Sequence, residues 1–263
     1  MINLFRKIRK QLADSNKPLQ YLRYAIGEIV LVVIGILIAL AINNWNQERL
    51  LKIQQIEILE DFIETLEVDR KTFEQSIKRG ENATASIEIV LNHLNADLPY
   101  ADSLKFYFGS ITDTWGVRVN RSIYESLKSE GLAIISNKEL REAIVRLYDG
   151  LSPGQDRRNE RYRDIIDEFS SKILSTRFDA MWEGNQFDWS KKNNYTYSNV
   201  DQLHGEMVPL NFEELKNDQE FLYSLKTLRN RRFWLMNFDN TIVRNSINDL
   251  IIKIENELFE LKK

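Results

Sequence analysis

Residues 26–42 read IGEIVLVVIGILIALAI, seventeen residues with one ionisable side chain, Glu28. An α-helix of this length rises about 25 Å, close to the thickness of the hydrocarbon core of a bilayer. Tyr21 and Tyr24 precede the stretch and Trp45 follows it, at the positions where amphipathic rings anchor a helix to the two interfaces. The sequence therefore predicts a helix that crosses the membrane once, with the lipid bilayer as its first partner.

The charges that flank the apolar stretch predict its orientation. Residues 1–25 carry six basic side chains and one acidic side chain, a sum of +5, whereas residues 44–62 carry two basic side chains. This bias places the N-terminus in the cytoplasm and the remainder of the chain in the periplasm, so that the predicted location is the inner (plasma) membrane. Because the whole chain has a net charge of −3, the part after residue 25 carries −8, which argues against nucleic acid as a partner.

A cleaved signal peptide is the alternative to a retained anchor. Ala39-Leu40-Ala41 fits the small-x-small pattern of a cleavage site that follows an apolar core. The long basic segment and the position of Trp45 favour retention instead. Both interpretations take the large C-terminal part out of the cytoplasm.

Counts of reactive side chains exclude several kinds of site. The chain has no cysteine and two histidines, which rules out thiol catalysis and cysteine metal sites. It also lacks the HExxH and GxSxG patterns of zinc proteases and serine hydrolases. We therefore predict no catalytic residue, no metal and no cofactor, and expect that the protein is not an enzyme. An enzyme built on paired carboxylates remains an alternative, because 39 acidic residues set no limit on such pairs.

Two long segments have the apolar spacing of helices. Residues 44–97 are predicted to form a stalk helix, with apolar side chains three or four positions apart at Ile56, Leu59, Ile63, Leu66, Phe73, Ile77, Ile87, Leu91 and Leu94. Residues 211–263 are predicted to form a second long helix that packs antiparallel on the stalk. Its apolar face is expected at Leu225, Leu228, Leu235, Phe238, Ile242, Ile247, Ile251, Ile254, Leu258 and Leu261. Asn211 and Glu214 have the spacing of a capping box at its start.

The central region, residues 98–210, contains shorter helical signals. Ser136 and Glu139 resemble a helix cap, and the helix that follows is expected to end at Gly150, ahead of Ser152-Pro153-Gly154. Two arginine clusters are expected on solvated helix faces: Arg157, Arg158, Arg161 and Arg163, and Arg229, Arg231 and Arg232. The predicted class is all-α, an extracytoplasmic helical bundle on a membrane-anchored stalk.

Three sets of residues are candidates for contacts. Gly35 and Ala39 form a small-xxx-small pair in the apolar stretch, and with Glu28 they mark a face for contact with another membrane helix. Glu28 also fits a side chain that simply reaches the cytoplasmic interface. An irregular segment rich in aromatic side chains either docks a partner or plugs the end of the bundle: Trp182, Phe187, Trp189, Tyr195 and Tyr197.

Three stretches carry a resemblance to a known family: FRKIRKQL at 5–12, YAIGEIVLVVIGILIALAINNWNQER at 24–49 and IYESLKSEGLAIISNKELREAIVRLY at 123–148. They resemble the uncharacterised single-pass inner-membrane protein family of Bacteroidota known as domain of unknown function 6090. The resemblance implies an uncleaved anchor and a helical periplasmic domain, and it assigns no catalytic or binding residue.

The function predicted from these features is a membrane-anchored periplasmic helical module. It either self-associates as a homo-oligomer through a coiled-coil-like stripe or serves as an accessory or scaffold subunit with another envelope protein as partner. The alternative is a periplasmic sensor or ligand-binding domain that signals through a separate protein, because about 25 cytoplasmic residues are too few for an output module.

Overall fold

A computed structural model of the chain describes residues 18–113, 116–182 and 205–263. The chain divides into two compact units, Met1–Glu57 (unit 1) and Ile58–Lys263 (unit 2). Helix α2 (Pro18–Asn95) contributes to both. The predictions for Phe187, Trp189, Tyr195 and Tyr197, and for the side chains of Tyr21 and Tyr24, lie outside the described residues.

Unit 1, where it is described, is the first part of α2. Its apolar side chains are exposed rather than packed, from Ile26 through Ile42 and on to Leu50 and Leu51. Among the described residues, one helix is long and apolar enough to cross a membrane by length and composition, and none of its apolar window is buried. Between Ile29 and Ile42 the sequence has no polar side chain, so this part of the helix has no polar face.

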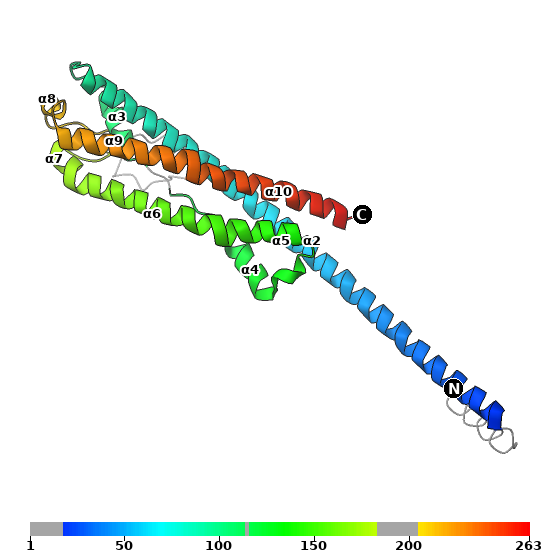
Figure 1. Cartoon of the computed structure of the whole chain (residues 1–263). Coiled ribbons are helices and arrows are strands. Elements are labelled where there is room, and N and C mark those ends of the chain that lie inside the picture. Colours follow the sequence, from blue (N-terminus) through cyan, green and yellow to red (C-terminus); the bar gives the residue numbers. More distant parts are fainter. Residues whose placement is uncertain (1–17, 114–115, 183–204) are drawn as a thin grey trace, which may run out of the picture. The chain divides into compact units, whose positions relative to one another are not determined.

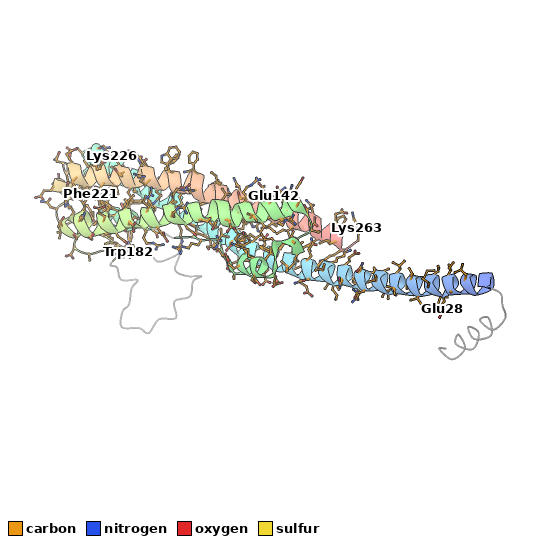
Figure 2. The ribbon with its side chains drawn as sticks, turned by 60° about the horizontal axis from the view of Figure 1, so that its bottom comes forward. Glu28, Glu142, Trp182, Phe221, Lys226 and Lys263 are labelled. Carbon is orange, nitrogen blue, oxygen red and sulfur yellow. The ribbon has the colours of Figure 1, made fainter. Side chains whose placement is uncertain are left out.

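Unit 2 is all-α, which confirms the predicted class, and it contains three long helical stretches that lie side by side (Figures 1 and 2). The first is α2 from Ile58 onward. The second joins α5 (Lys138–Val145), η2 (Arg146–Leu151), α6 (Ser152–Phe169), η3 (Ser170–Leu174) and α7 (Ser175–Arg177). The third joins α9 (Gln219–Trp234), η5 (Leu235–Asn240) and α10 (Thr241–Leu261). Shorter elements connect them: α3 (Leu104–Ser110), α4 (Ser122–Glu130), η1 (Leu132–Ile134) and α8 (Phe212–Leu215).

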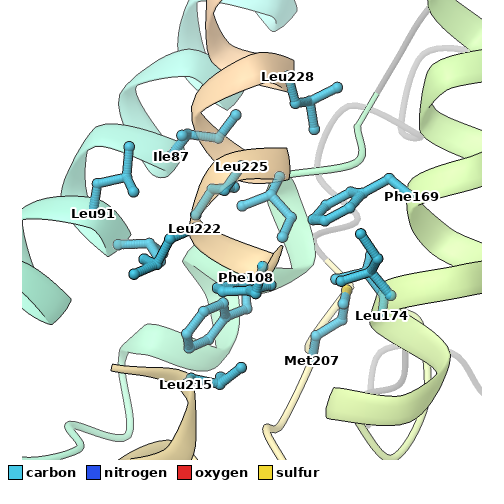
Figure 3. Packing of buried hydrophobic residues seen from close by; sticks show 14 of the residues in the cluster. Ile87, Leu91, Phe108, Phe169, Leu174, Met207, Leu215, Leu222, Leu225 and Leu228 are labelled. Atoms are coloured by element: carbon cyan, nitrogen blue, oxygen red, sulfur yellow. The ribbon is translucent and has the colours of Figure 1, made fainter. Parts of the chain in front are cut away.

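Two ion pairs show that the third stretch runs antiparallel to α2 within unit 2. Arg229 near the start of that stretch contacts Glu88 at 3.1 Å, and Lys262 at its end contacts Glu60 at 2.7 Å. The main core lies at the end of the unit nearer Glu88, where leucines of α9 meet Ile87 of α2 and aromatic and aliphatic side chains of α6, η3 and α3 (Figure 3).

The buried stripe of α2 is continuous, but it is not purely apolar. It follows a regular alternation of three and four residues through Leu59, Phe62, Leu66, Asp69, Phe73, Ser76, Gly80, Ala83, Ile87, Val90 and Leu94. Ile56, Ile63 and Ile77, which the sequence pattern places in the stripe, are half-buried on its flank. At Gly80 an added Cβ would overlap the Sδ atom of Met236, so the missing side chain is what lets η5 approach α2.

Side-chain caps begin helices α5, α8 and α9 of unit 2. The Asn211 side chain accepts a hydrogen bond from Glu214 N at 3.4 Å and donates to the Glu214 carboxylate at 2.7 Å, so Asn211 is the N-cap of the short α8. The single long helix predicted from residue 211 is therefore corrected, because the long helical stretch begins separately at α9. Asp218 caps α9 by accepting from Phe221 N at 3.0 Å. The cap of α5 is Asn137 rather than Ser136, because it is the Asn137 side chain that reaches Leu140 N, at 3.2 Å.

The predicted helix end at Gly150 is wrong. The chain continues from α5 into α6 through the π-helical segment η2, and Ser152 N donates to Leu147 O, five residues earlier. Pro153 then occupies one of the first two positions of α6. In an ordinary α-helix a proline lacks the N–H that would bond to the carbonyl four residues earlier, and its ring clashes with that carbonyl. Just before Pro153 the backbone instead uses the hydrogen bonds of a π-helix, which join residues five positions apart.

A second π-helical segment explains why two predicted core residues lie on the surface. A uniform helical period assigns Phe238 and Ile242 to the buried face, yet both are exposed. The segment η5 lies between Trp234 and Thr241 and has more residues per turn than an α-helix, so it rotates the residues that follow. Met236, Asn240 and Val243 are buried in their place.

Candidate functional site

The most distinctive site in unit 2 is a group of buried polar side chains around the non-helical segment that follows α3. We call it the buried polar seam and define it by Asp69, Gln155, Asn159, Tyr162, Arg232 and Asn240. Gln155, Asn159 and Tyr162 recur at three- and four-residue spacing along α6, which places them on the face that packs inward. Such groups are costly to bury unless they find hydrogen-bond partners.

Most of these partners are backbone groups of residues 111–113 and 117–120. The Val117 carbonyl accepts from Gln155 Nε2 at 3.0 Å and from Asn159 Nδ2 at 2.9 Å. The Asp69 carboxylate accepts from Asn120 N at 2.9 Å. A chain that runs through a helical bundle without helical bonds of its own needs partners of this kind, and the seam supplies them.

Arg232 is the centre of the seam. Its side chain is 1 % exposed, so the prediction that it lies on a solvated face is wrong. Nε donates to the Tyr162 hydroxyl at 2.7 Å, and Nη2 donates to the carbonyls of Ile111 at 2.8 Å and Asp113 at 3.0 Å. By contrast, Arg229 of the same cluster forms an ion pair with Glu88, as expected for a surface arginine.

Burial alters the acid–base behaviour of the seam. Desolvation raises the pKa of Asp69 from 3.8 to about 6, and the hydrogen bond from Asn120 N opposes part of this rise. The neighbouring Tyr148 has its pKa raised, first by burial and then by the negative charge of Asp69. The hydroxyls of Tyr148 and Ser152 and the Oε1 atom of Gln155 have no hydrogen-bond partner among the described residues. The seam therefore holds one carboxyl group that titrates near neutral pH.

A more exposed polar cluster joins α4 to η2. Tyr124 donates its hydroxyl proton to Asp149 at 2.5 Å, and Arg121 contacts the same carboxylate at 3.1 Å. These contacts, led by the Tyr124 hydrogen bond, lower the pKa of Asp149. Arg121 also donates to the Tyr148 carbonyl. The cluster fixes the irregular connection onto the second helical stretch.

The predicted membrane contact residues all lie on α2 in unit 1. A Cβ at Gly35 would have nothing within 4 Å, and Ala39, one helical turn later, is exposed. Glu28 is partly exposed, and Trp45 is exposed. Nothing in the described part of unit 1 covers the face that Gly35 and Ala39 share.

Of the predicted aromatic surface, Trp182 lies within the described residues (Figure 2). Its Nε1 atom donates to the Gly109 carbonyl at 3.1 Å, while 45 % of the residue remains exposed. Just before it, Phe178 is buried against Phe108 and Phe221 and forms an isolated antiparallel bridge with Pro209. The ring of Phe178 closes the core here, and Trp182 lies at its edge.

Sequence reasoning missed an exposed aromatic surface on the third helical stretch. Trp234 and Phe238 stack with ring centroids 4.5 Å apart, and Phe233 meets Trp234 edge-on at 6.0 Å. Ile242 continues the same exposed side one turn later. A uniform helical period does not include the rotation that η5 causes. It therefore assigns Phe238 and Ile242 to the core, although both are exposed.

Comparison with known proteins places the chain in a family. The sequence model described as a family of unknown function (DUF6090) matches residues 28–178, more than half of the chain. The chain belongs to the DUF6090 family. No curated protein and no solved structure matches it.

The part shared with the DUF6090 family includes most of the buried polar seam. Asp69, Gln155, Asn159 and Tyr162 lie within residues 28–178. Arg232 and Asn240, together with the exposed aromatic surface, lie beyond it. The DUF6090 span thus covers the first two helical stretches of unit 2, and the third completes the seam from outside that span.

An open hollow of about 580 Å³ also lies within the DUF6090 span. It is lined by Leu132, Ala133, Arg141, Glu142, Val145 and Arg146. Arg141 is partly engaged, because Nη1 donates to the Ile135 carbonyl at 2.7 Å. In the parts of the chain that the structure describes, no three His, Asp or Glu side chains are grouped so as to hold a metal ion.

Proposed function

We propose that the protein is a single-pass membrane-anchored helical module that acts through contacts with other proteins rather than through catalysis. In this proposal residues 1–25 lie in the cytoplasm, residues 26–43 cross the inner membrane and unit 2 lies in the periplasm. The observation that carries it is the fully unburied apolar window of α2, since a long run of exposed apolar side chains is stable in lipid and not in water. The basic N-terminal segment supports the orientation.

The buried polar seam supports a non-enzymatic role. Most of its hydrogen bonds are made to the chain's own backbone, at Ile111, Asp113, Val117 and Asn120. The side chains of the seam therefore hold the segment that follows α3 in place. In this proposal the module binds through its surface, either to a second copy or to another envelope protein.

Membrane extraction and topology test this proposal. We expect the full-length chain to stay in the pellet after carbonate extraction at high pH, because a transmembrane helix resists that treatment. We also expect protease added outside the inner membrane of spheroplasts to digest unit 2. Recovery of a soluble form that begins at residue 42, or protection of unit 2 from the protease, would contradict the anchor or the orientation.

Self-association of the anchor is a separate expectation. Replacement of Gly35 by Ile should lower the dimer fraction in blue-native gels, because a side chain at this position keeps two helix backbones apart. A loss of ~1–2 kcal/mol in helix association corresponds to roughly a 10-fold weaker dimer. Leu37→Ile, on another side of the same helix, is the matched control. Equal dimer fractions in both variants would exclude contact through Gly35.

Ligand binding is the second candidate function, favoured by the hollow beside Arg141 and Arg146. Two guanidinium groups at the rim of an apolar surface suit a small molecule that has an anionic group and an apolar part. Thermal-shift screening of the detergent-solubilised full chain against small carboxylates tests it, with Arg146→Gln as the variant expected to lose any response.

A further inference from the structure

The outer side of the third helical stretch differs in charge from the outer side of α6. In α6 all the exposed residues are charged: Arg157, Arg158, Glu160, Arg161, Arg163, Asp164, Asp167 and Glu168. From Leu228 to Asn248 the exposed residues are Asn230, Arg231, Phe233, Trp234, Asn237, Phe238, Ile242 and Asn245. Only one of this second set is charged. Both helices belong to one chain and one unit, so the contrast does not reflect overall composition.

We call this second set the neutral face. It has the composition of the centre of a protein–protein interface, which is depleted in charge and enriched in aromatic residues. Trp234 and Phe238 remain 57 % and 44 % exposed although they stack on each other. The segment η5 brings them into one line with Ile242, since it rotates the helix while Leu235 and Met236 stay buried. Exposed apolar side chains gathered in this way mark a surface that another molecule covers.

We infer that the neutral face binds the neutral face of a second copy of this chain, in a parallel two-fold pair. This inference rests on the proposed function, because two copies anchored in one membrane present unit 2 in the same direction. A two-fold interface uses the same patch on both copies, so a face that has almost no charge and is rich in asparagine is complementary to itself. Each asparagine amide both donates and accepts hydrogen bonds, so Asn230 and Asn245 find partners in the equivalent residues.

The available area fits a dimer. Aromatic side chains bury ~150–250 Å² each. With exposed fractions near one half, the three rings of the neutral face (Phe233, Trp234 and Phe238) offer roughly 300 Å² of apolar surface per copy. Together with the asparagines and Ile242 of the same face, this corresponds to a small interface, at the low end of the range for specific complexes. Two stacked pairs of rings then supply the central anchors that binding energy requires.

Single-cysteine cross-linking in native membranes tests the inference. The natural chain has no cysteine, so each introduced thiol reports on one position only. We expect Asn230→Cys and Asn245→Cys to give a cross-linked dimer with a short bis-maleimide. The matched control is Asp164→Cys, an exposed residue on the charged face of α6, which should cross-link at least 10-fold less. Adding Trp234→Asp to Asn230→Cys should reduce the dimer to the level of the control.

The cross-linking results show whether a second copy of the chain covers the neutral face. No dimer from membrane-retained Asn230→Cys, equal yields at positions 230 and 164, or an adduct of another mass would each overturn the pairing of two copies. Trp234 is exposed, so Trp234→Asp should leave the melting curve of the full chain unchanged at a detergent dilution where the natural chain is monomeric, and a lowered melting temperature under that condition assigns the residue to the fold instead. Failure of the anchor is seen separately, as release of the chain by carbonate.

Discussion

Replacing Arg232 by Gln is expected to lower the free energy of unfolding by about 4 kcal/mol, with a fall in Tm of about 10 °C for a domain of this size. The guanidinium group donates to the Tyr162 hydroxyl and to the carbonyls of Ile111 and Asp113, all inside the seam. Hydrogen bonds from a charged donor contribute ~1.5–3 kcal/mol each, and acceptors left buried without a partner add a further cost.

The neighbouring Arg231 provides the control for this change. It lies on the same helix and is exposed, so Arg231→Gln should change the free energy of unfolding by less than about 0.5 kcal/mol. Urea titration of the full chain in a non-ionic detergent, followed by tryptophan fluorescence, measures both variants. Equal stabilities for the two variants would show that Arg232 does not hold residues 111–113 in place.

The second large effect is a change in pH dependence on replacing Asp69 by Asn. Because the pKa of Asp69 is raised from 3.8 to about 6 on folding, the folded state holds its proton more tightly than the unfolded state. The stability that this carboxyl group contributes is fully present below pH 3.8, falls as the pH rises and is lost above about pH 6. A shift of this size corresponds to about 3 kcal/mol over that window.

The asparagine side chain of this variant does not titrate, and its oxygen can still accept from Asn120 N. We therefore expect Asp69→Asn to match the natural protein near pH 4 and to be more stable at pH 7.5, by up to about 3 kcal/mol. Comparison of the two proteins across this range cancels the contributions of other acidic groups. Asp61→Asn, at an exposed position two turns earlier on α2, is the matched control for removing one carboxylate from this helix. A constant offset between Asp69→Asn and the natural protein at all pH values would contradict the raised pKa.

The long helices were predictable because their apolar spacing is a local signal. The apolar run from Ile26 and the buried face of α10 at Ile247, Ile251 and Ile254 each follow from a few neighbouring residues. The π-helical segments were not predictable in this way. A uniform period carries Phe238 and Ile242 into the core, and only the extra residue in the turn at Leu235–Asn240 moves them out.

The buried polar seam also escaped prediction for a physical reason. Asp69, Ser76 and Gly80 look like interruptions of the apolar stripe on α2, yet they are buried at regular positions. Asp69 is polar and Gly80 is small because of partners that lie far away in the chain. Asn120 N bonds to Asp69, and Met236 fills the space beside Gly80. Those partners lie 51 and 156 residues away in the chain, so spacing within α2 could not reveal them.

The ion pair between Glu60 and Lys262 joins the first and last turns of unit 2, with 2.7 Å between Lys262 Nζ and Glu60 Oε1. A pulling force applied between these two ends would peel α10 from α2 turn by turn, beginning with this pair, instead of shearing the whole length at once. Contacts broken in sequence resist far less force than contacts loaded together. A cargo attached to Lys263 would therefore strain unit 2 along its weakest mechanical direction, whereas a load taken up at the opposite tip, near α8, would leave that pair closed.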